Sequence, residues 1–233
     1  MFTGIVQGAH PVTTLQIQDG LLTFGVTVPP KLLDGVEVGA SVAVNGVCLT
    51  LTRIEGQTLL FDVMQQTLRV TNLYSIQQGD VVNVERSFNA GAEIGGHIVS
   101  GHVDGVATVS QIERPPNNFI LTVEMPEPWM KYVFPKGFLA LNGVSLTVAE
   151  VDKARRTITV YLIPETLRRT TFPDRKVGDQ INFEVERQTQ AMVDTVRDFL
   201  GELIEHKSLS VEHLRELQQA PLQLSGSDRP DAA

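Results

Sequence analysis

The chain contains two copies of one sequence, offset by about 97 residues. The segment NGVCLT at 45–50 returns as NGVSLT at 142–147, and GDVVNVE at 79–85 returns as GDQINFE at 178–184. A repeat of this length is that of a small folded domain, because solenoid repeats are only roughly 20–50 residues long. The sequence therefore predicts two homologous domains, and two similar ligands if each domain keeps a binding site.

Composition and net charge limit the kinds of molecule that the protein is expected to bind. With 42% hydrophobic and 20% charged residues, a chain of 233 residues can bury a core in each of two small domains. The net charge of −8 disfavours nucleic acid and anionic membrane surfaces, which attract clustered Lys and Arg. Cys48 is the single cysteine, so an internal disulfide is excluded, and neither a signal-peptide pattern nor an apolar stretch of roughly 20 residues is found. We expect a cytoplasmic protein that binds a small molecule.

Short runs of alternating apolar residues, separated by Gly, Asp and Asn, recur along both copies. Many short strands at close spacing are typical of a β-sandwich or a small barrel, which makes the fold all-β. Two segments that open with proline, 29–35 and 126–134, predict helical turns, since proline suits the first turn of a helix. The expected strands are 21–28, 41–54, 58–64 and 80–86 in the first copy, and 106–112, 119–125, 138–151, 157–163 and 180–186 in the second.

The C-terminal segment differs from both copies. From Thr189, whose hydroxyl is a candidate N-cap, apolar residues recur at helical spacing in TQAMVDTVRDFLGELIEH. This amphipathic helix either packs on its own barrel or is shared between subunits. The predicted parts are an N-terminal domain at 1–94, a C-terminal domain at 95–188, an oligomerisation helix at 189–207, and a short helix with a disordered tail at 208–233.

The NGVCLT and NGVSLT segments place small polar side chains on one face of a strand. Successive strand residues point to opposite faces, so Cys48 and Thr50 share the face opposite two aliphatic residues, as do Ser145 and Thr147 in the second copy. One such face alone is more often a strand surface wetted by solvent. Its recurrence favours a surface that binds a polar heteroaromatic ligand.

Cys48 and Ser145 occupy equivalent positions in the two copies. A free cysteine is more often a small buried hydrophobe than a nucleophile, and nothing in the sequence supplies an adjacent base. We therefore predict that both side chains contact ligand and handle protons, rather than attack the ligand covalently.

Two histidines occur in the segment GGHIVSGH. Their five-residue spacing directs His97 and His102 to different sides of a strand or helix, so they are not expected to share a metal ion. His102 takes the position of Ile5 in the first copy, which would place a titratable imidazole in one of two otherwise similar sites. Glu186 has no carboxylate counterpart, and either adds to this asymmetry or is a solvated carboxylate at a strand end.

Basic residues could hold a hydroxylated or charged tail of the ligand. The candidates are Lys136 in FPKGF and the TLR segments at 67–69 and 166–168, although each alone is typical of a surface. The sequence lacks GxxxxGKS or GxxxxGKT, GxGxxG after a strand, HExxH and GxSxG. Nucleotide hydrolysis, hydride transfer, zinc proteolysis and serine hydrolysis are therefore without support.

Five segments in order, MFTGIVQG, NGVCLT, EIGGHIVSGHVDG, NGVSLTV and IPETLRRTT, resemble riboflavin synthase of the type built from two homologous halves. The resemblance covers about residues 1–200 and implies two six-stranded antiparallel Greek-key barrels in tandem, followed by a C-terminal α-helix. It also implies a homotrimer joined through these helices, with each active site between barrels of neighbouring chains. The resemblance also raises the question whether the protein associates with lumazine synthase, and the sequence leaves that question open.

The reaction implied by the resemblance is a dismutation of two molecules of 6,7-dimethyl-8-ribityllumazine. One molecule donates a four-carbon unit to the other, which gives riboflavin and 5-amino-6-(D-ribitylamino)uracil without an added cofactor or metal. The chemistry needs loss of a proton from the methyl group at position 7 of one lumazine, and attack of the resulting carbanion on the other.

Carried over position by position, the resemblance implies two sets of substrate-binding residues. The N-terminal site would be lined by Gly4, Ile5, Val6, Cys48, Leu49, Thr50, Asp62, Val63, Met64, Gln65, Gln66 and Thr67. The C-terminal site would be lined by Gly101, His102, Val103, Lys136, Ser145, Leu146, Thr147, Ile163, Pro164, Glu165, Thr166, Leu167 and Arg168. Ser41 and His97 are further binding candidates.

The resemblance also implies roles in catalysis. His102 is the predicted proton carrier, with Cys48, Ser145 and Thr147 assisting, and which of them is the base stays open. The chain departs from the expected pattern at the end of its last strand, where Glu186 stands in place of an Asp. A helper role for this carboxylate is therefore left open.

Two other functions compete with the enzyme. One is a non-catalytic lumazine or flavin carrier, like the antenna proteins of the same fold, which have lost the GGHxxSGH segment. Retention of His97, His102, Cys48 and Ser145 favours the enzyme. The other is the flavin-binding barrel of a reductase, which would need a nucleotide-binding partner domain, and no βαβ pattern follows here.

Overall fold

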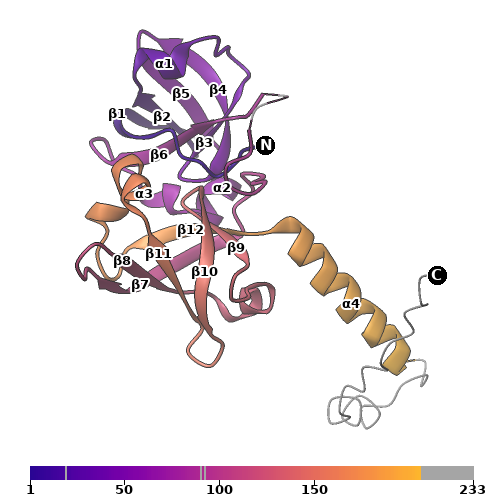
Figure 1. The fold of residues 1–233 in the computed structure, drawn as a ribbon. Coiled ribbons are helices and arrows are strands. Elements are labelled where there is room, and N and C mark those ends of the chain that lie inside the picture. Colours follow the sequence, from indigo (N-terminus) through magenta and orange to yellow (C-terminus); the bar gives the residue numbers. More distant parts are fainter. Residues whose placement is uncertain (19, 90, 92, 206–233) are drawn as a thin grey trace, which may run out of the picture. The chain divides into compact units, whose positions relative to one another are not determined.

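A computed structural model describes residues 1–18, 20–89, 91 and 93–205 of the chain (Figure 1). Met1–Gln190 form one compact unit, and the described residues from Ala191 to Glu205 belong to a second unit. The predicted short helix and tail at 208–233 lie outside the described residues. Within the described ranges, no helix combines the length and apolar character needed to cross a membrane.

Two closed antiparallel barrels of six strands make up the first unit, which confirms the predicted fold class. The first barrel contains β1 (Gly8–Gln18), β2 (Leu21–Thr27), β3 (Ser41–Val44), β4 (Val47–Glu55), β5 (Thr58–Val63) and β6 (Val81–Arg86). The second contains β7 (Gly105–Glu113), β8 (Phe119–Glu124), β9 (Phe138–Leu141), β10 (Val144–Asp152), β11 (Thr157–Leu162) and β12 (Gln180–Val185). Their strand orders, β1-β2-β5-β4-β3-β6 and β10-β11-β8-β7-β12-β9, pair non-consecutive neighbours as in a Greek key.

The two repeated Asn-Gly pairs are hairpin turns. Asn45 and Gly46 have φ of 46° and 81°, and Asn142 and Gly143 have φ of 44° and 79°. A two-residue turn of this kind needs positive φ at both positions, which Asn and Gly tolerate best. The long runs expected as single strands are therefore each two paired strands, β3 with β4 and β9 with β10. The Asn-Gly pair was the sequence signal for this turn.

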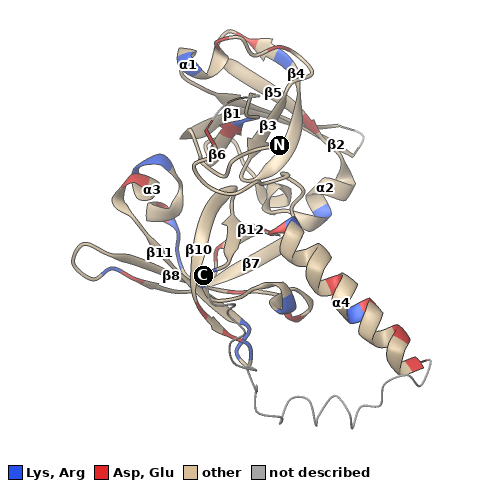
Figure 2. Ribbon diagram, turned by 45° about the vertical axis from the view of Figure 1, so that its right-hand side comes forward, with Lys and Arg blue, Asp and Glu red and all other residues tan. Residues whose placement is uncertain are grey.

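Hydrophobic side chains fill both barrels. Phe24, Leu51 and Phe61 are fully buried in the first barrel, and Leu121 and Phe183 in the second. Charged residues are mostly found near strand ends, in turns and on helices, as Figure 2 shows. This distribution keeps unpaired charges out of the two barrel interiors.

Short helices connect the strands. The proline-led segments form α1 (Pro30–Leu33) and the 3₁₀ helix η2 (Glu127–Tyr132), as predicted. Four further pieces were not predicted, because helices this short show little periodicity in a sequence. They are α2 (Gln65–Val70), η1 (Asn72–Ser75), α3 (Pro164–Arg169) and η3 (Phe172–Asp174).

The C-terminal helix α4 (Arg187–Glu205) begins two residues earlier than expected. The backbone amide of Gln190 donates to the backbone carbonyl of Glu186 at 2.9 Å, which places Glu186 at the N-cap position. The prediction that Thr189 caps the helix is therefore wrong. Thr189 lies inside the first turn, and its hydroxyl donates to the Glu186 carboxylate.

Apolar residues recur along α4 at the predicted helical spacing. The exposed ones are Met192, Val196, Phe199 and Ile204. An exposed apolar stripe of this kind suits a helix–helix contact, so a role of α4 in oligomerisation stays a prediction.

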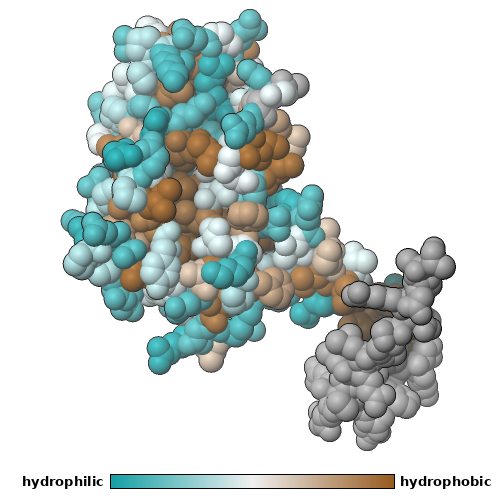
Figure 3. All heavy atoms as spheres, in the orientation of Figure 1, coloured by the Kyte–Doolittle hydropathy of each residue, from teal (hydrophilic) through white to brown (hydrophobic). Residues whose placement is uncertain are grey.

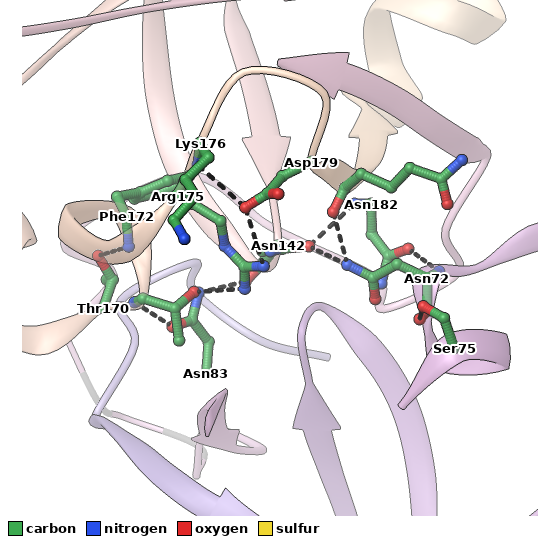
Figure 4. A network of polar contacts seen from close by, with 12 residues as sticks. Asn72, Ser75, Asn83, Asn142, Thr170, Phe172, Arg175, Lys176, Asp179 and Asn182 are labelled. Carbon is green, nitrogen blue, oxygen red and sulfur yellow. Dashed lines mark hydrogen bonds and ion pairs between the residues drawn. The ribbon is translucent and has the colours of Figure 1, made fainter. Parts of the chain in front are cut away.

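A buried asparagine joins the first barrel to the second (Figure 4). Asn83 on β6 is 1% exposed. Its side-chain amide donates to the backbone carbonyl of Asn142 at 3.0 Å and accepts from the backbone amide of Thr171 at 2.9 Å. One side chain thus satisfies a donor and an acceptor of the opposite barrel.

Asn182 on β12 repeats this arrangement in the other direction. It is also 1% exposed, and its side chain donates to the backbone carbonyl of Asn45 at 2.9 Å. It accepts from the backbone amide of Asn72 at 2.6 Å. The two barrels are therefore joined by reciprocal hydrogen bonds, which we call the asparagine seam.

Glu85 and Glu184, two residues beyond these asparagines, hold the segments that precede the barrels. Glu85 accepts from the backbone amide and hydroxyl of Thr3 at 2.7 and 2.9 Å. Glu184 accepts from the backbone amide and hydroxyl of Ser100 at 2.7 and 2.8 Å, and from the Gly101 amide at 2.9 Å. Side chains two residues apart on a strand point to the same face. In each repeated Asn-x-Glu pattern, the glutamate therefore lies on the same strand face as the asparagine of the seam.

Burial raises the pKa of both carboxyls, although their hydrogen bonds act in the opposite direction. A carboxyl whose pKa is raised by folding adds to the free energy of unfolding, and this contribution is complete at pH values below the ordinary pKa of the carboxyl. That contribution is lost as the pH rises through the raised pKa. We therefore expect Glu85→Gln to remove part of the pH dependence of the free energy of unfolding, measured by denaturant unfolding between about pH 4 and pH 8.

The exposed carboxylate of Glu37 provides a matched control. Glu37→Gln should retain the wild-type decrease in the free energy of unfolding with rising pH. If Glu85→Gln retains it as well, folding does not raise the pKa of Glu85.

Candidate functional site

The two predicted polar faces lie at equivalent places on β4 and β10. Cys48 and Ser145 are half-buried, and Thr50 and Thr147 are exposed. The residues between them point into the barrels, where Leu49 and its counterpart Leu146 are buried. The predicted alternation of the two faces is thus confirmed, and any ligand contact of these two leucines would go through their backbone.

Strand pairing extends each polar face by two residues. The β4–β5 register pairs Leu51 with Phe61, so continuing it places Asp62 beside Thr50 and Met64 beside Cys48. Asp62 is oriented by the Thr23 hydroxyl, which donates to it at 2.7 Å.

The second barrel carries the equivalent extension. The β10–β11 register pairs Val148 with Val160. Continued beyond the paired residues of the two strands, this register would place Tyr161 beside Thr147 and Ile163, just after β11, beside Ser145. Tyr161 was missed by the sequence analysis, although it is the counterpart of Asp62. The two faces therefore differ at this position, with a carboxylate on one and a phenol on the other.

Both faces expose a hydrophobic side chain at their edge. Met64 is 65% exposed and Ile163 is 63% exposed. Figure 3 shows further hydrophobic surface on the barrels. Single exposed apolar residues are common on proteins, but their recurrence at equivalent positions makes the two faces candidates for contact with a ligand or another chain.

The helices beside the faces contain the remaining predicted residues. In α2, Gln65 and Gln66 are exposed and Thr67 is half-buried, whereas Val63 before the helix is buried. In α3, Pro164, Glu165 and Arg168 are exposed, and Thr166 and Leu167 are half-buried. Hydrogen bonds and charge from Arg168 and Arg169 lower the pKa of Glu165.

The segments that precede the barrels are exchanged between them. The backbone amide of Ser145 donates to the carbonyl of Gly4 at 2.8 Å, and that of Cys48 donates to the carbonyl of Gly101 at 2.8 Å. The grouping of Gly4 to Val6 with Cys48, and of Gly101 to Val103 with Ser145, is therefore wrong. The physical reason is an antiparallel bridge between Phe2 and Val99, where the two segments pair and cross to the opposite barrels.

Glycine is required at both crossing points. Gly4 has φ of 71° and Gly101 has φ of 82°, which other residues rarely adopt. A Cβ on Gly4 would lie 2.5 Å from the Cβ of Ser145, and one on Gly101 would lie 2.6 Å from the Cβ of Cys48. The exchanged segments therefore lie directly against the two polar strands.

His102 is located on the segment that crosses to the first barrel. Its side chain is exposed, whereas its backbone amide donates to the Ser100 hydroxyl and its backbone carbonyl accepts from Arg187. The Arg187 guanidinium donates to the His102 carbonyl and, at 2.8 Å, to the Asp104 carboxylate. Arg187 and Asp104, which the sequence analysis missed, thus fix the loop that contains the predicted proton carrier.

His97 lies against the second barrel. Its Nδ1 is 2.6 Å from the Ser145 hydroxyl oxygen, and its ring stacks on Phe138. Each polar face therefore has a histidine segment beside it, and the idea that only one site carries an imidazole does not hold. Ser41 is the first-barrel counterpart of Phe138, and it pairs with Thr50 across β3 and β4.

Lys136 has an unusual backbone conformation. Its φ is 69°, and its amide donates to the Val148 carbonyl at 2.8 Å. Its first-barrel counterpart is Gly39, which has φ of 93° and donates to the Leu51 carbonyl at 2.8 Å. The second copy thus has an exposed lysine at the position where the first copy has glycine, the residue that adopts a positive φ most easily.

A cavity of about 660 Å³ lies elsewhere, along the asparagine seam. Its lining includes Asn72, Tyr74, Asp80, Arg175 and Asp179, and none of the predicted site residues. The described residues contain no cluster of three His, Cys, Asp or Glu suited to a metal ion. In one chain, the two polar faces are open strand surfaces outside this cavity.

Comparison with known proteins identifies the family. A model of the lumazine binding domain matches residues 3–87 and again residues 100–186, once in each barrel. The riboflavin synthase of Escherichia coli strain K12 is 47% identical over 202 residues, which are 86% of this chain and 94% of the relative. This chain belongs to the riboflavin synthase family. The riboflavin synthase of Bacillus subtilis strain 168 is 34% identical over 186 residues, covering 80% of this chain and 85% of the relative.

Solved structures agree with this family. LumP complexed with riboflavin has a TM-score of 0.75 and 28% identity, and the match covers 80% of this chain and 100% of LumP. LumP complexed with 6,7-dimethyl-8-(1'-D-ribityl) lumazine has a TM-score of 0.73 and 27% identity, with the same coverage. The names of the riboflavin synthase relatives confirm the prediction of an enzyme.

We expect Lys136→Gly to stabilise the protein. A non-glycine residue in the left-handed region costs about 1–2 kcal/mol, so the free energy of unfolding should rise by about 1 kcal/mol. Lys31 is an exposed lysine with ordinary backbone geometry in α1. Lys31→Gly should lower the free energy of unfolding by about 0.5–1 kcal/mol, because glycine disfavours a helix. Denaturant unfolding measures both changes, and equal losses in the two variants would refute strain at Lys136.

Proposed function

We propose that the protein is a riboflavin synthase that acts on two molecules of 6,7-dimethyl-8-ribityllumazine. One lumazine donates a four-carbon unit to the other, which yields riboflavin and 5-amino-6-(D-ribitylamino)uracil without an added cofactor. The observation that carries the proposal is the repeated polar face, Cys48 with Thr50 and Ser145 with Thr147, in a member of the riboflavin synthase family. A dismutation of two identical molecules needs two similar binding surfaces, which a duplicated barrel supplies.

Each face suits one lumazine. The exposed apolar side chains of Met64 and Ile163 would contact the flat ring, and the strand hydroxyls and thiol would bond to its polar edge. A few placed polar groups on an otherwise apolar lining are typical of small-molecule sites. The α2 and α3 segments and Lys136 would bind the hydroxylated side chain of the ligand.

The chemistry requires proton transfer and orientation. Loss of a proton from the methyl group at position 7 forms a carbanion, which then attacks the second lumazine. Positioned side chains such as Ser145, Thr147, Cys48 and His102 can relay such protons, typically for a factor of about 10²–10⁴. Binding the two rings face to face would add an effective concentration on the order of 10⁵ M or more.

In this proposal, the two lumazines of one reaction are bound by faces on different chains. Within one chain, the exchanged segments lie against the two polar strands, because the Ser145 amide donates to the Gly4 carbonyl and the Cys48 amide to the Gly101 carbonyl. A complete site would then form when the first-barrel face of one chain meets the second-barrel face of its neighbour. The predicted homotrimer joined through α4 supplies such contacts.

Other features of the family are carried over as proposals. A cytoplasmic location and an association with lumazine synthase fit a biosynthetic enzyme of this family. The domain boundaries at residues 94/95 and 188/189 are likewise kept as proposals, since the strands of the barrels span 8–86 and 105–185.

A lumazine or flavin carrier is the second candidate function. The solved LumP complexes with riboflavin and with the ribityl lumazine share this fold at 27–28% identity. The buried contact of His97 with Ser145 favours the enzyme, because a chromophore carrier has no need of a group that can accept a proton.

Incubation with the lumazine alone separates the two candidates. We expect the purified protein to convert 6,7-dimethyl-8-ribityllumazine into riboflavin, observed as the appearance of riboflavin absorbance. Two lumazines should be consumed for each riboflavin formed, because the lumazine that donates the four-carbon unit is released as 5-amino-6-(D-ribitylamino)uracil. Tight binding without product would leave the carrier as the function.

A further inference from the structure

The Arg187 guanidinium joins the first turn of α4 to the loop that contains His102. Its Nη1 donates to the Asp104 carboxylate at 2.8 Å and to the side-chain oxygen of Gln190 at 2.7 Å, and its Nη2 donates to the His102 backbone carbonyl. The Asp104 side chain is only 7% exposed, and its second oxygen accepts from the Val185 amide at 2.8 Å. We call Arg187 and Asp104 the clip, because together they tie the His102 backbone to the end of β12.

The first copy of the repeat shows which of these contacts the fold itself needs. Gln7 is the counterpart of Asp104, and its side-chain oxygen accepts from the Arg86 amide at the end of β6 at 2.9 Å. Asp104 accepts the equivalent bond from Val185 at the end of β12. A neutral amide is therefore sufficient to hold the end of the last strand of a barrel. The negative charge of Asp104 is an addition, and it faces Arg187.

The guanidinium is also an addition of the second copy. Phe88 stands at the position of Arg187, and Ile5 stands at the position of His102. A phenyl ring cannot donate a hydrogen bond to a backbone carbonyl. The clip therefore occurs in the copy that has an imidazole at this position, and the copy that has a hydrocarbon there lacks both of its charges.

We propose that Asp104 and Arg187 are positioning residues that place His102 for the reaction. This inference rests on the function proposed above and on His102 as a proton carrier in it. The His102 side chain is exposed, so its position depends on the backbone that carries it. Arg187 holds the His102 carbonyl, and the Asp104 amide donates to the Phe183 carbonyl at 2.9 Å. The backbone on both sides of Val103 is thus fixed, which limits where the imidazole can meet a ligand on the first-barrel face.

Two substitutions remove the clip while leaving the strand end intact. Asp104→Asn loses the charge but keeps a side-chain oxygen for the Val185 amide, as Gln7 does for Arg86. Arg187→Lys keeps the charge but lacks the planar fork that reaches two acceptors at once. We expect each variant to lower kcat about 10–10²-fold, because a small misplacement of a reacting group can cost a factor of this size. The KM for the lumazine should stay near its wild-type value.

The same substitutions in a His102→Ala background separate positioning from mere support of the fold. Changes that act through one residue are not additive. We therefore expect Asp104→Asn and Arg187→Lys to lower kcat in the wild type and to cause no further loss in His102→Ala. Losses of equal size in both backgrounds would overturn the proposal.

Hydrogen exchange measures the placement of the loop without relying on activity. Backbone amides of residues 102–104 should exchange faster in Asp104→Asn and Arg187→Lys than in the wild type, because the loop opens more often. Unchanged exchange in both variants would overturn the proposal, since the clip would then not hold the His102 backbone.

Arg114 supplies the matched control. It is an exposed arginine that also donates to a backbone carbonyl, that of Pro173 at 2.8 Å, and it is not part of either face. Arg114→Lys should keep the wild-type kcat and the wild-type exchange at residues 102–104. A wild type that makes no riboflavin would overturn the proposed function and this inference together. A wild type that makes riboflavin, with clip variants of unchanged kcat, would overturn this inference alone.

Discussion

Two buried asparagines hold the two barrels together through reciprocal hydrogen bonds to the backbone of the opposite barrel. Asn83 and Asn182 each bridge to the backbone of the opposite barrel as both donor and acceptor. An amide side chain can do both at once, whereas an ionised carboxylate lacks the donor and an aliphatic residue lacks both. A buried polar group left without its partner costs about 1–3 kcal/mol, so the seam stabilises one relative placement of the barrels.

This placement determines what the two polar faces can do. Glu85 and Glu184, on the same strands as the asparagines, hold Thr3 and Ser100. The segments containing these two residues then pair with each other and cross to the opposite barrels. Each polar strand is consequently lined by a segment from the other half of the chain. The duplication has therefore produced one interlocked unit with two unequal faces, rather than two independent domains.

Much of the fold could be predicted from the sequence, and less of the site. The repeat predicted two similar barrels, and strand alternation correctly placed Cys48 and Thr50 opposite two aliphatic residues. The Asn-Gly turns could have been predicted as well, because they need positive φ. The exchange of the segments could not, since it depends on hydrogen bonds between residues that are far apart in the sequence. The same holds for the contact between His97 and Ser145, because sequence spacing gives no information about which barrel a crossing segment reaches.

We propose that each site combines the first-barrel face of one chain with the second-barrel face of its neighbour. Thr50→Arg and Thr147→Arg each place a long charged side chain on one exposed face, so each variant alone should form no riboflavin. Co-expression with two different tags, followed by purification on both, gives mixed oligomers in which one unaltered face of each kind can meet. We expect riboflavin synthesis to return in these mixed oligomers. Mixed oligomers as inactive as their parents would contradict it, because the two faces would then act within a single chain.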